Sequence, residues 1–291
     1  MKLLLCTDLD RTLLPNGPQP ESASVRALFN QLALRKEVTL VYVSGRDKLL
    51  VQQAIKNYQL PVPAFVIADV GSTIYQIKKN KWIHLEHWDD EISADWNGKS
   101  NKDLQNILKN FKDIRLQEYS KQKTHKLSYY VPLYTDYETL LNEIKSCFNN
   151  DNIKTNLVWS VDGAESMGLL DILPASANKK HAIEFLMDEF DFSLNETIFA
   201  GDSGNDISVM ASPIHSVLVA NATDKVKNLA VQQANINHEE ASLYLAQGDF
   251  FGMNGNYCAG ILEGVVHYMP AVKSWLGLES SNIKSNNLKT E

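Results

Sequence analysis

The start of this chain alternates short apolar segments with segments in which apolar residues recur at helical spacing. An almost unbroken apolar run covers residues 3–7, and similar runs cover 38–43 and 64–68. Runs this short and continuous are typical of strands that are buried on both faces of a sheet. Apolar residues three and four apart at 25–32 and 51–58 indicate amphipathic helices between these strands. The alternation predicts an α/β fold with a Rossmann-like core built on a parallel sheet.

The pattern changes after about residue 80 and returns at Asn178. We therefore expect a discontinuous core domain of residues 1–78 and 172–270, with an α+β cap domain of residues 79–171 inserted into it. Inserts of this kind often close over a site. The elements expected in the insert are helices near 101–112 and 137–148 and strands near 126–131, 157–161 and 169–173. Those expected after it are helices at 183–190 and 260–268 and strands at 197–200 and 216–220.

Composition and charge narrow the classes of function. Lys and Arg number 28 against 35 Asp and Glu, so the net charge is −7 and no nucleic-acid partner is expected. Cys6, Cys147 and Cys258 are far apart and form no CxxC pair, which argues against a disulfide framework or a zinc site. The sequence has no run of roughly 20 apolar residues and no signal-peptide pattern, so we expect a cytoplasmic protein without a membrane partner. The Ser-, Asn- and Lys-rich tail at 278–291 is expected to be disordered.

Two aspartates, Asp8 and Asp10, directly follow the first expected strand. Ligands of open α/β sheets bind beyond the carboxyl ends of the strands, so both carboxylates can face the same crevice. Carboxylates this close repel each other unless a cation lies between them, and a hard, oxygen-preferring ion such as Mg²⁺ fits. A pair of aspartates in a turn or at a helix cap is the alternative.

Three further polar segments lie at similar positions. Ser44-Gly45-Arg46 follows a strand and precedes a helix, where a hydroxyl and backbone N–H groups form an anion site or, alternatively, an ordinary N-cap. Gly201-Asp202-Ser203-Gly204-Asn205-Asp206 also follows a strand, and its two acids favour metal binding over a simple turn. Lys179 begins a helix, where its charge opposes the helix dipole, so we expect an anionic partner unless the side chain is simply solvated.

Taken in order, these segments resemble the four motifs of the haloacid dehalogenase superfamily. Within it the chain is most similar to the sucrose-phosphate phosphatases, and the stretches that carry this likeness are 70–75, 127–130, 171–174 and 259–264. The insert resembles the larger α/β cap of the superfamily's sugar phosphatases. Arg11 departs from the pattern, because a small or amide residue is usual there.

The resemblance implies a magnesium-dependent phosphatase whose substrate is a phosphorylated sugar. It makes Asp8 the nucleophile that forms an aspartyl-phosphate, and Asp10 the general acid and base. It implies Mg²⁺ at Asp8, the Asp10 carbonyl and Asp202. The residues expected to bind phosphate or to support the site are Ser44, Gly45, Lys179 and Asn205, supported by Ser203 and Asp206.

Sucrose 6-phosphate is the substrate that the resemblance implies. Alternation along the expected cap strand sends Lys126, Ser128 and Tyr130 to one face, where they could contact the sugar; alternatively, Tyr129 and Tyr130 simply pack the cap. Two other functions stay open. One is a phosphatase for mannosylfructose or glucosylglycerol phosphate, and the other is a phosphatase-like partner of a sugar-phosphate synthase. Loss of an acid from the motifs would favour a non-catalytic partner, and none is lost.

Overall fold

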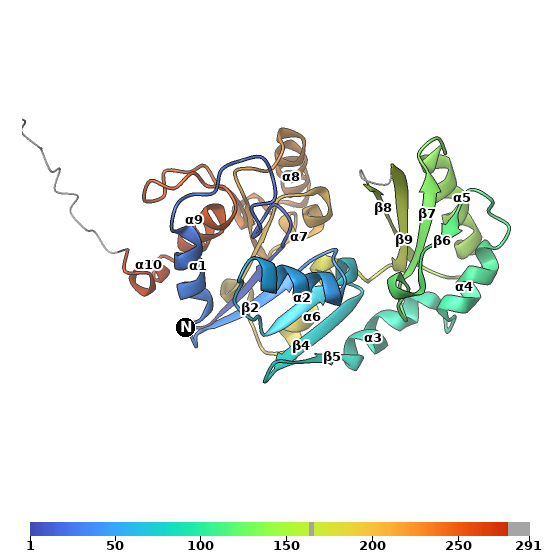
Figure 1. The fold of residues 1–291 in the computed structure, drawn as a ribbon, viewed down its shortest axis with the longest axis horizontal. Helices are drawn as coiled ribbons and strands as arrows, with labels where there is room; N and C mark the ends of the chain where they lie inside the picture. The colour runs from blue at the N-terminus through green and yellow to red at the C-terminus, as the bar shows by residue number, and fades with distance from the viewer. Residues whose placement is uncertain (163–165, 279–291) are drawn as a thin grey trace, which may run out of the picture.

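The fold contains two separate β-sheets (Figure 1). A computed structural model describes residues 1–162 and 166–278. In these ranges the larger sheet has the strand order β12-β11-β10-β1-β2-β3-β4-β5, and the smaller sheet has the order β6-β7-β9-β8. The strands from β12 to β3 are parallel, whereas β4 and β5 join the β3 edge as an antiparallel hairpin. The predicted α/β class with a parallel-sheet core is therefore confirmed.

Helices cover both faces of the larger sheet. Leu3 and Leu5 of β1 enter one hydrophobic core, and Leu4 and Cys6 enter the other. The strands of this sheet are β1 (Leu3–Thr7), β2 (Val38–Val43), β3 (Phe65–Ala68), β4 (Thr73–Lys78), β5 (Lys81–His84), β10 (Thr197–Gly201), β11 (His215–Leu218) and β12 (Leu243–Leu245). The helices on one face are α1 (Val25–Ala33), α2 (Lys48–Asn57), α9 (Cys258–Tyr268) and α10 (Val272–Trp275). Those on the other are α3 (Glu86–Ser93), α6 (Lys179–Glu189), α7 (Ile207–Met210) and α8 (Asp224–Asn237).

The parallel arrangement brings three predicted motifs to one edge. Thr7 of β1 pairs with Tyr42 of β2 on one side and with Ala200 of β10 on the other. The residues that follow these three strands therefore leave the sheet side by side, as the carboxyl ends of parallel strands must.

The smaller sheet is antiparallel and has helices on one face. Its strands are β6 (Arg115–Leu116), β7 (Leu127–Pro132), β8 (Thr155–Asp162) and β9 (Met167–Pro174), and α4 (Asn101–Leu108) and α5 (Tyr137–Asn150) cover it. Leu127, Tyr129 and Val131 pack against these helices. Ser128 and Tyr130 alternate with them and lie on the opposite face, which we call the open face of the cap sheet. Tyr129 thus packs into the cap core, whereas Tyr130 lies on the open face, where the Arg115 guanidinium is 4.6 Å from its ring centroid.

The division into a core and an inserted cap stays a prediction, but strand pairing changes where we propose the insert begins. Residues 81–84 were expected in the insert, yet they form β5 and pair with β4 in the larger sheet. Helix α3 then packs Trp88 and Ile92 against the same sheet. We therefore propose that the cap begins after Ser93 and ends near Pro174. From residue 279 on, the tail expected to be disordered lies outside the described residues. In the described ranges no helix is long and apolar enough to cross a membrane.

Candidate active site

Asp8 is the first residue after β1 and is buried at the carboxyl edge of the larger sheet. The Nζ atom of Lys179 lies 3.0 Å from Asp8 Oδ1 and 2.6 Å from Asp206 Oδ1. The Lys179 side chain is only 1% exposed, so the alternative of a solvated lysine is wrong. Its neighbour Lys180 is the surface lysine and pairs with Glu184. Helix α6 thus begins by directing one lysine into the acidic cluster and the next toward solvent.

The loop from Gly201 to Asp206 is folded around the Asp206 carboxylate. Asp206 Oδ2 accepts hydrogen bonds from the backbone N–H groups of Asp202 and Ser203, at 3.1 and 2.9 Å, and from Ser203 Oγ at 3.0 Å. A Cβ atom at Gly201 would lie 2.5 Å from Asp206 Cγ, so a larger residue there would displace the carboxylate. Because both oxygens of Asp206 have partners, this residue is suited to fix the position of Lys179.

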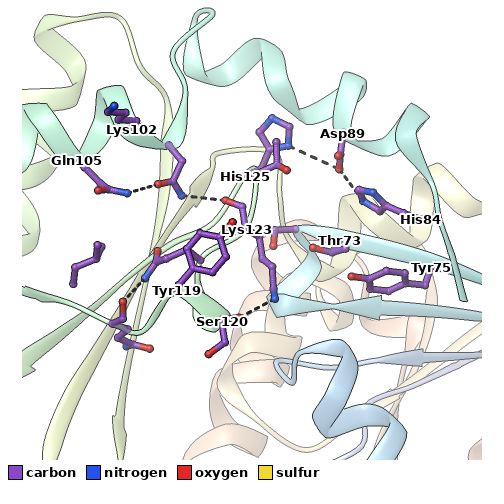
Figure 2. A pocket seen from close by; sticks show the side chains of 16 residues that line it. Thr73, Tyr75, His84, Asp89, Lys102, Gln105, Tyr119, Ser120, Lys123 and His125 are labelled. Carbon is purple, nitrogen blue, oxygen red and sulfur yellow. Dashed lines mark hydrogen bonds and ion pairs between the residues drawn. The ribbon is translucent and has the colours of Figure 1, made fainter.

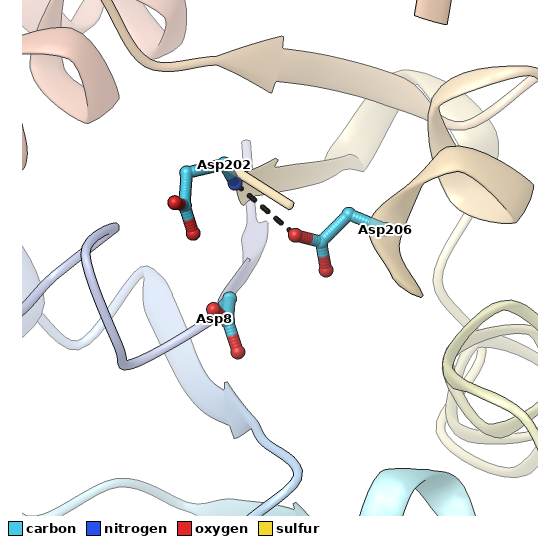
Figure 3. Close-up of side chains that lie close together, drawn as sticks. All are labelled: Asp8, Asp202 and Asp206. Atoms are coloured by element: carbon cyan, nitrogen blue, oxygen red, sulfur yellow. Dashed lines mark hydrogen bonds between the residues drawn. The ribbon is translucent and has the colours of Figure 1, made fainter. Parts of the chain in front are cut away.

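Asp8, Asp202 and Asp206 offer carboxylate oxygens that lie within 4.8 Å of one another (Figure 3). In Figure 3 the Asp202 carboxylate points toward Asp8, and its backbone N–H donates to Asp206. Asp202 Oδ1 also accepts a hydrogen bond from Thr12 Oγ1 at 3.1 Å, and Arg11 Nε lies 3.5 Å from Asp202 Oδ2. Converging carboxylate oxygens are the ligands that Mg²⁺ and Ca²⁺ prefer, so this donor set fits a hard divalent cation.

Burial dominates the protonation of this cluster. It raises the pKa of Asp8 to about 7, against the opposing effect of Lys179. Burial and the charge of Asp206 raise the pKa of Asp202 to about 6. Burial alone would lower the pKa of Lys179, but the charges of Asp206 and Asp8 outweigh it and hold that pKa above its usual range. Lys179 therefore stays charged, and further positive charge is needed to keep both carboxylates ionised below neutral pH.

Asp10 lies apart from this cluster, because Arg46 holds its carboxylate. Arg46 Nε donates to Asp10 Oδ2 at 2.7 Å and Nη2 donates to Oδ1 at 2.6 Å, while Asn16 Nδ2 donates to Oδ1 at 2.7 Å. Partial burial tends to raise the pKa of Asp10, but the hydrogen bonds from Arg46 and Asn16 and the charge of Arg46 lower it below its usual value. Sequence reasoning missed this role of Arg46, although the residue stands in the Ser44-Gly45-Arg46 segment.

Ser44 and Gly45 follow β2 at the same edge of the sheet. Ser44 is buried, and its Oγ accepts a hydrogen bond from the backbone N–H of Arg46 at 3.1 Å. The N-cap of α2 is Asp47, whose side chain accepts from Leu50 N, so Ser44 is not an ordinary helix cap. In the described chain a Cβ atom at Gly45 would meet only Val70, at 3.7 Å, which leaves open space beside the Gly45 backbone.

The predicted sugar-facing residues of the cap lie near one another but already have protein partners. Lys126 Nζ lies 3.1 Å from Asp171 Oδ2 and 3.5 Å from Asp69 Oδ1. Ser128 Oγ donates to Asp171 Oδ1 at 2.5 Å. The Tyr130 hydroxyl donates to Glu118 Oε2 at 2.8 Å.

Sequence reasoning missed Asp69 and Asp171 as partners of Lys126. Asp69 follows the last residue of β3, so it carries the same strand-end signal as Asp8. Asp171 alternates with Leu170 and Ile172 of β9, and those two pack into the cap core. Both acids could have been proposed from the strand pattern, but their pairing with Lys126 depends on how cap and core meet.

Two cavities lie between the sheets. One of about 510 Å³ separates β8 from the catalytic edge and is bordered by Asn156, Lys179, Gly204 and Asn205. The other, of about 760 Å³, lies beside the β4–β5 hairpin (Figure 2), and there Asp89 contacts both His84 and His125. No predicted catalytic or phosphate-binding residue lines the larger cavity, so the smaller one adjoins the chemical groups. Asn205 also lines this smaller cavity, and Asn205 Oδ1 accepts from Ser203 Oγ at 2.8 Å.

The chain resembles known proteins along most of its length. The family model for sucrose-6F-phosphate phosphohydrolase matches residues 1–269. A HAD-like hydrolase of Nitrosococcus oceani is 48% identical over 275 residues, which cover 94% of this chain and 74% of that protein. A mannosylfructose-phosphate phosphatase of Agrobacterium fabrum is 27% identical over 91% of this chain and 96% of its own length.

A solved structure shares the fold. The sucrose-phosphatase of Synechocystis sp. PCC6803, in complex with sucrose and phosphate, matches with a TM-score of 0.71 and 24% identity and covers 92% of this chain and 99% of its own. Two plant relatives are longer than the part of this chain that matches them. The match spans 54% of a sucrose-phosphatase relative from Arabidopsis thaliana and 59% of one from Nicotiana tabacum.

Proposed function

We propose a substrate and residue roles from one premise: the chain belongs to the sucrose-6F-phosphate phosphohydrolase family of HAD-like hydrolases and is a phosphatase. We propose that it hydrolyses a phosphorylated sugar through an aspartyl-phosphate and that the sugar phosphate is sucrose 6-phosphate. The observation that best supports the chemistry is the buried contact of Lys179 with Asp8 and Asp206 at the sheet edge.

In the proposed reaction an Asp8 oxygen attacks phosphorus, and the bond between phosphorus and the sugar oxygen breaks. The departing sugar oxygen takes a proton from Asp10. A water molecule that gives a proton to Asp10 then attacks the aspartyl-phosphate, which releases phosphate and restores the Asp8 carboxylate. Lys179 holds positive charge beside the reacting carboxylate throughout, and we assign Ser44, Gly45 and Asn205 to the phosphate oxygens.

Asp10 must carry a proton to act as an acid, and in the described conformation Arg46 opposes this. We therefore propose that Arg46 releases Asp10 when substrate binds. The guanidinium would then be available to the phosphate anion, which it can bind with the same two-pronged geometry that it uses on Asp10.

Mg²⁺ is the cation that we propose for the acidic cluster, and Asp8, Asp202 and the Asp10 carbonyl are the groups that would hold it. When bound, it would neutralise charge between the Asp8 carboxylate and the phosphate dianion. We assign Asp206 a supporting role because both of its oxygens already accept hydrogen bonds from Lys179, Asp202 and Ser203.

Family membership and the polar open face of the cap sheet support the choice of sucrose 6-phosphate. A disaccharide offers many hydroxyl groups, and Lys126, Ser128 and Tyr130 place an ammonium and two hydroxyls on that face. The alternative substrate is mannosylfructose phosphate. The Agrobacterium relative favours it, because the match covers 91% of this chain and 96% of that phosphatase. Glucosylglycerol phosphate and docking to a sugar-phosphate synthase remain further hypotheses.

Phosphate release from a panel of sugar phosphates tests this proposal. Sucrose 6-phosphate should exceed glucose 6-phosphate and fructose 6-phosphate by at least about 10² in kcat/KM, since a missing ring leaves cap polar groups without partners. Comparable values would make the protein a general sugar phosphatase. A higher value for mannosylfructose or glucosylglycerol phosphate would replace sucrose, and no release from any substrate would favour a non-catalytic partner.

A further inference from the structure

Arg11 has an unusual and firmly held backbone. Its φ angle is 58°, in the left-handed region that costs most residues free energy. The Arg11 backbone N–H donates to Asn16 Oδ1 at 2.7 Å, and its carbonyl accepts from Asn221 Nδ2 at 2.6 Å. One contact from the same loop and one from a segment 210 residues away therefore fix the direction in which this side chain leaves the catalytic loop.

The side chain lies against a proposed metal ligand. Arg11 Nε is 3.5 Å from Asp202 Oδ2, and Nη2 donates to the Asn221 carbonyl at 3.4 Å. Within the described chain the buried Nε atom has no hydrogen-bond partner, so its contact with Asp202 is an ion pair without a hydrogen bond. Thr12 Oγ1 already donates to Asp202 Oδ1, so Arg11 lies at the second oxygen of this carboxylate.

This placement sets two positive groups in competition for one carboxylate. Asp202 is among the three acids whose oxygens converge, and a divalent cation held there would meet the Arg11 guanidinium on the same side chain. We propose that Arg11 weakens divalent-cation binding at this cluster and so sets the cation concentration at which the site fills. In the absence of the cation, it partly neutralises the crowded carboxylates. The inference rests on the cation site of the proposed function but not on the identity of the sugar.

Two variants remove the charge in different ways. Arg11→Gln keeps much of the length and a donor for the Asn221 carbonyl, whereas Arg11→Gly also suits the left-handed backbone and should fold without strain. Arg11→Lys keeps the charge. Arg35→Gln is the matched control, because Arg35 pairs with Glu37 rather than with the acidic cluster.

The experiment is calorimetric titration of the EDTA-treated 291-residue chain with MgCl₂, without substrate. Arg11→Gln and Arg11→Gly should lower the Mg²⁺ dissociation constant about tenfold, since a unit charge beside a divalent ion matters even in a polar medium. Arg11→Lys and Arg35→Gln should stay within about twofold of wild type. In EDTA, Arg11→Gln should melt below wild type, and saturating Mg²⁺ should reverse this order.

Equal or weaker Mg²⁺ binding in both charge-removing variants, with normal binding in the wild type, would overturn the role of Arg11 and leave the proposed function intact. A destabilised Arg11→Gln whose melting temperature stays equally low with and without Mg²⁺ would show an ordinary structural ion pair and would also overturn it. If the wild-type protein itself shows no saturable Mg²⁺ binding, the cation site fails and both inferences fall together. Tightened binding without hydrolysis of any sugar phosphate would support Arg11 and refute the proposed hydrolysis, whereas hydrolysis of another sugar phosphate would refute only the sucrose substrate.

Discussion

The polar side chains at the catalytic edge of the larger sheet are paired with other segments of the core, whereas most partners on the open face of the cap sheet belong to the cap itself. Lys179 contacts Asp8 across 171 residues and is 1% exposed. Tyr130 contacts Glu118 across 12 residues, and Ser128 contacts Asp171 across 43. The geometry at the edge thus depends on the core, whereas the geometry of the open face depends on the small sheet and, through the contact of Lys126 with Asp69, on how cap and core meet.

The catalytic edge and the open face also differ in how deeply their ion pairs and hydrogen bonds are buried. Lys179 and Asp206 are almost completely buried, so neither can lose its partner without leaving an unpaired charge inside the protein. The Tyr130–Glu118 contact is exposed, so its loss can be compensated by water. Changes at the edge should therefore affect both chemistry and stability, and a change at the exposed contact of Tyr130 should affect the choice of substrate while leaving the fold intact; Lys126 and Ser128 on the same face are themselves buried.

Replacing the nucleophile should produce the largest effect. Asp8→Asn keeps the size of the side chain but removes the attacking charge, so we expect turnover to fall by roughly 10³ or more on every substrate. Phosphate release from p-nitrophenyl phosphate and from a sugar phosphate measures this. Asp224→Asn, at an exposed position of α8, is the matched control and should behave as wild type. Activity of Asp8→Asn within tenfold of wild type would remove Asp8 from the chemistry.

The adjacent Lys179 and Lys180 allow a direct test of how burial changes the contribution of an ion pair to stability. Lys179→Ala leaves Asp8 and Asp206 without their shared partner, so we expect the free energy of unfolding to drop by about 3–5 kcal/mol. Lys180→Ala removes an exposed pair with Glu184 and should change the free energy of unfolding by less than about 1 kcal/mol. Urea unfolding followed by circular dichroism compares the two. Similar losses for both lysines would contradict the view that the edge is structurally constrained.

Much of the catalytic edge could be predicted from sequence because a strand end followed by acids is a local pattern. Asp8 and Asp202 each stand one residue beyond a buried strand, and that position alone places them at the same edge. The pairing of Arg46 with Asp10 could not be predicted in this way, because it joins segments 36 residues apart and depends on side-chain direction.

The β4–β5 hairpin was missed for a different reason. It forms one edge of the larger sheet, so its strands carry Thr, Gln, Lys and His and resemble a polar loop. Helix α8 was also not predicted, because its buried positions are the small residues Ala230 and Ala234 rather than a stripe of large apolar side chains. In both places tertiary contacts, not local pattern, determine the element.

Removing one hydroxyl from the open face should separate specificity from chemistry. Tyr130→Phe loses the contact with Glu118 and a candidate sugar donor, so we expect kcat/KM for the preferred sugar phosphate to fall by up to about tenfold. Hydrolysis of p-nitrophenyl phosphate should stay within about twofold of wild type. Tyr134→Phe, which changes a tyrosine that is 87% exposed, is the control. Equal losses on both substrates would mean that Tyr130 positions the cap rather than the sugar.

The smallest expected effect is a pH dependence of stability that arises from the buried acids of the catalytic edge. Asp8 and Asp202 have pKa values raised to about 7 and about 6, above those of an unfolded chain. Between those unfolded values and pH 7 the folded protein therefore holds more protons than the unfolded one. These two groups then make the metal-free protein less stable as the pH rises through this window.

Mg²⁺ should counter this loss, because a cation competes with protons for the same carboxylates. We expect the Mg²⁺-induced rise in melting temperature to be larger near pH 7.5 than near pH 5.5, by a few degrees for a chain of this size. Differential scanning fluorimetry in EDTA and in MgCl₂ at both pH values measures the difference. Asp8→Asn should flatten it, since the amide neither titrates nor carries charge, whereas Tyr130→Phe should leave it unchanged. A Mg²⁺ effect that is independent of pH in the wild type would mean that the cation does not bind at these buried acids.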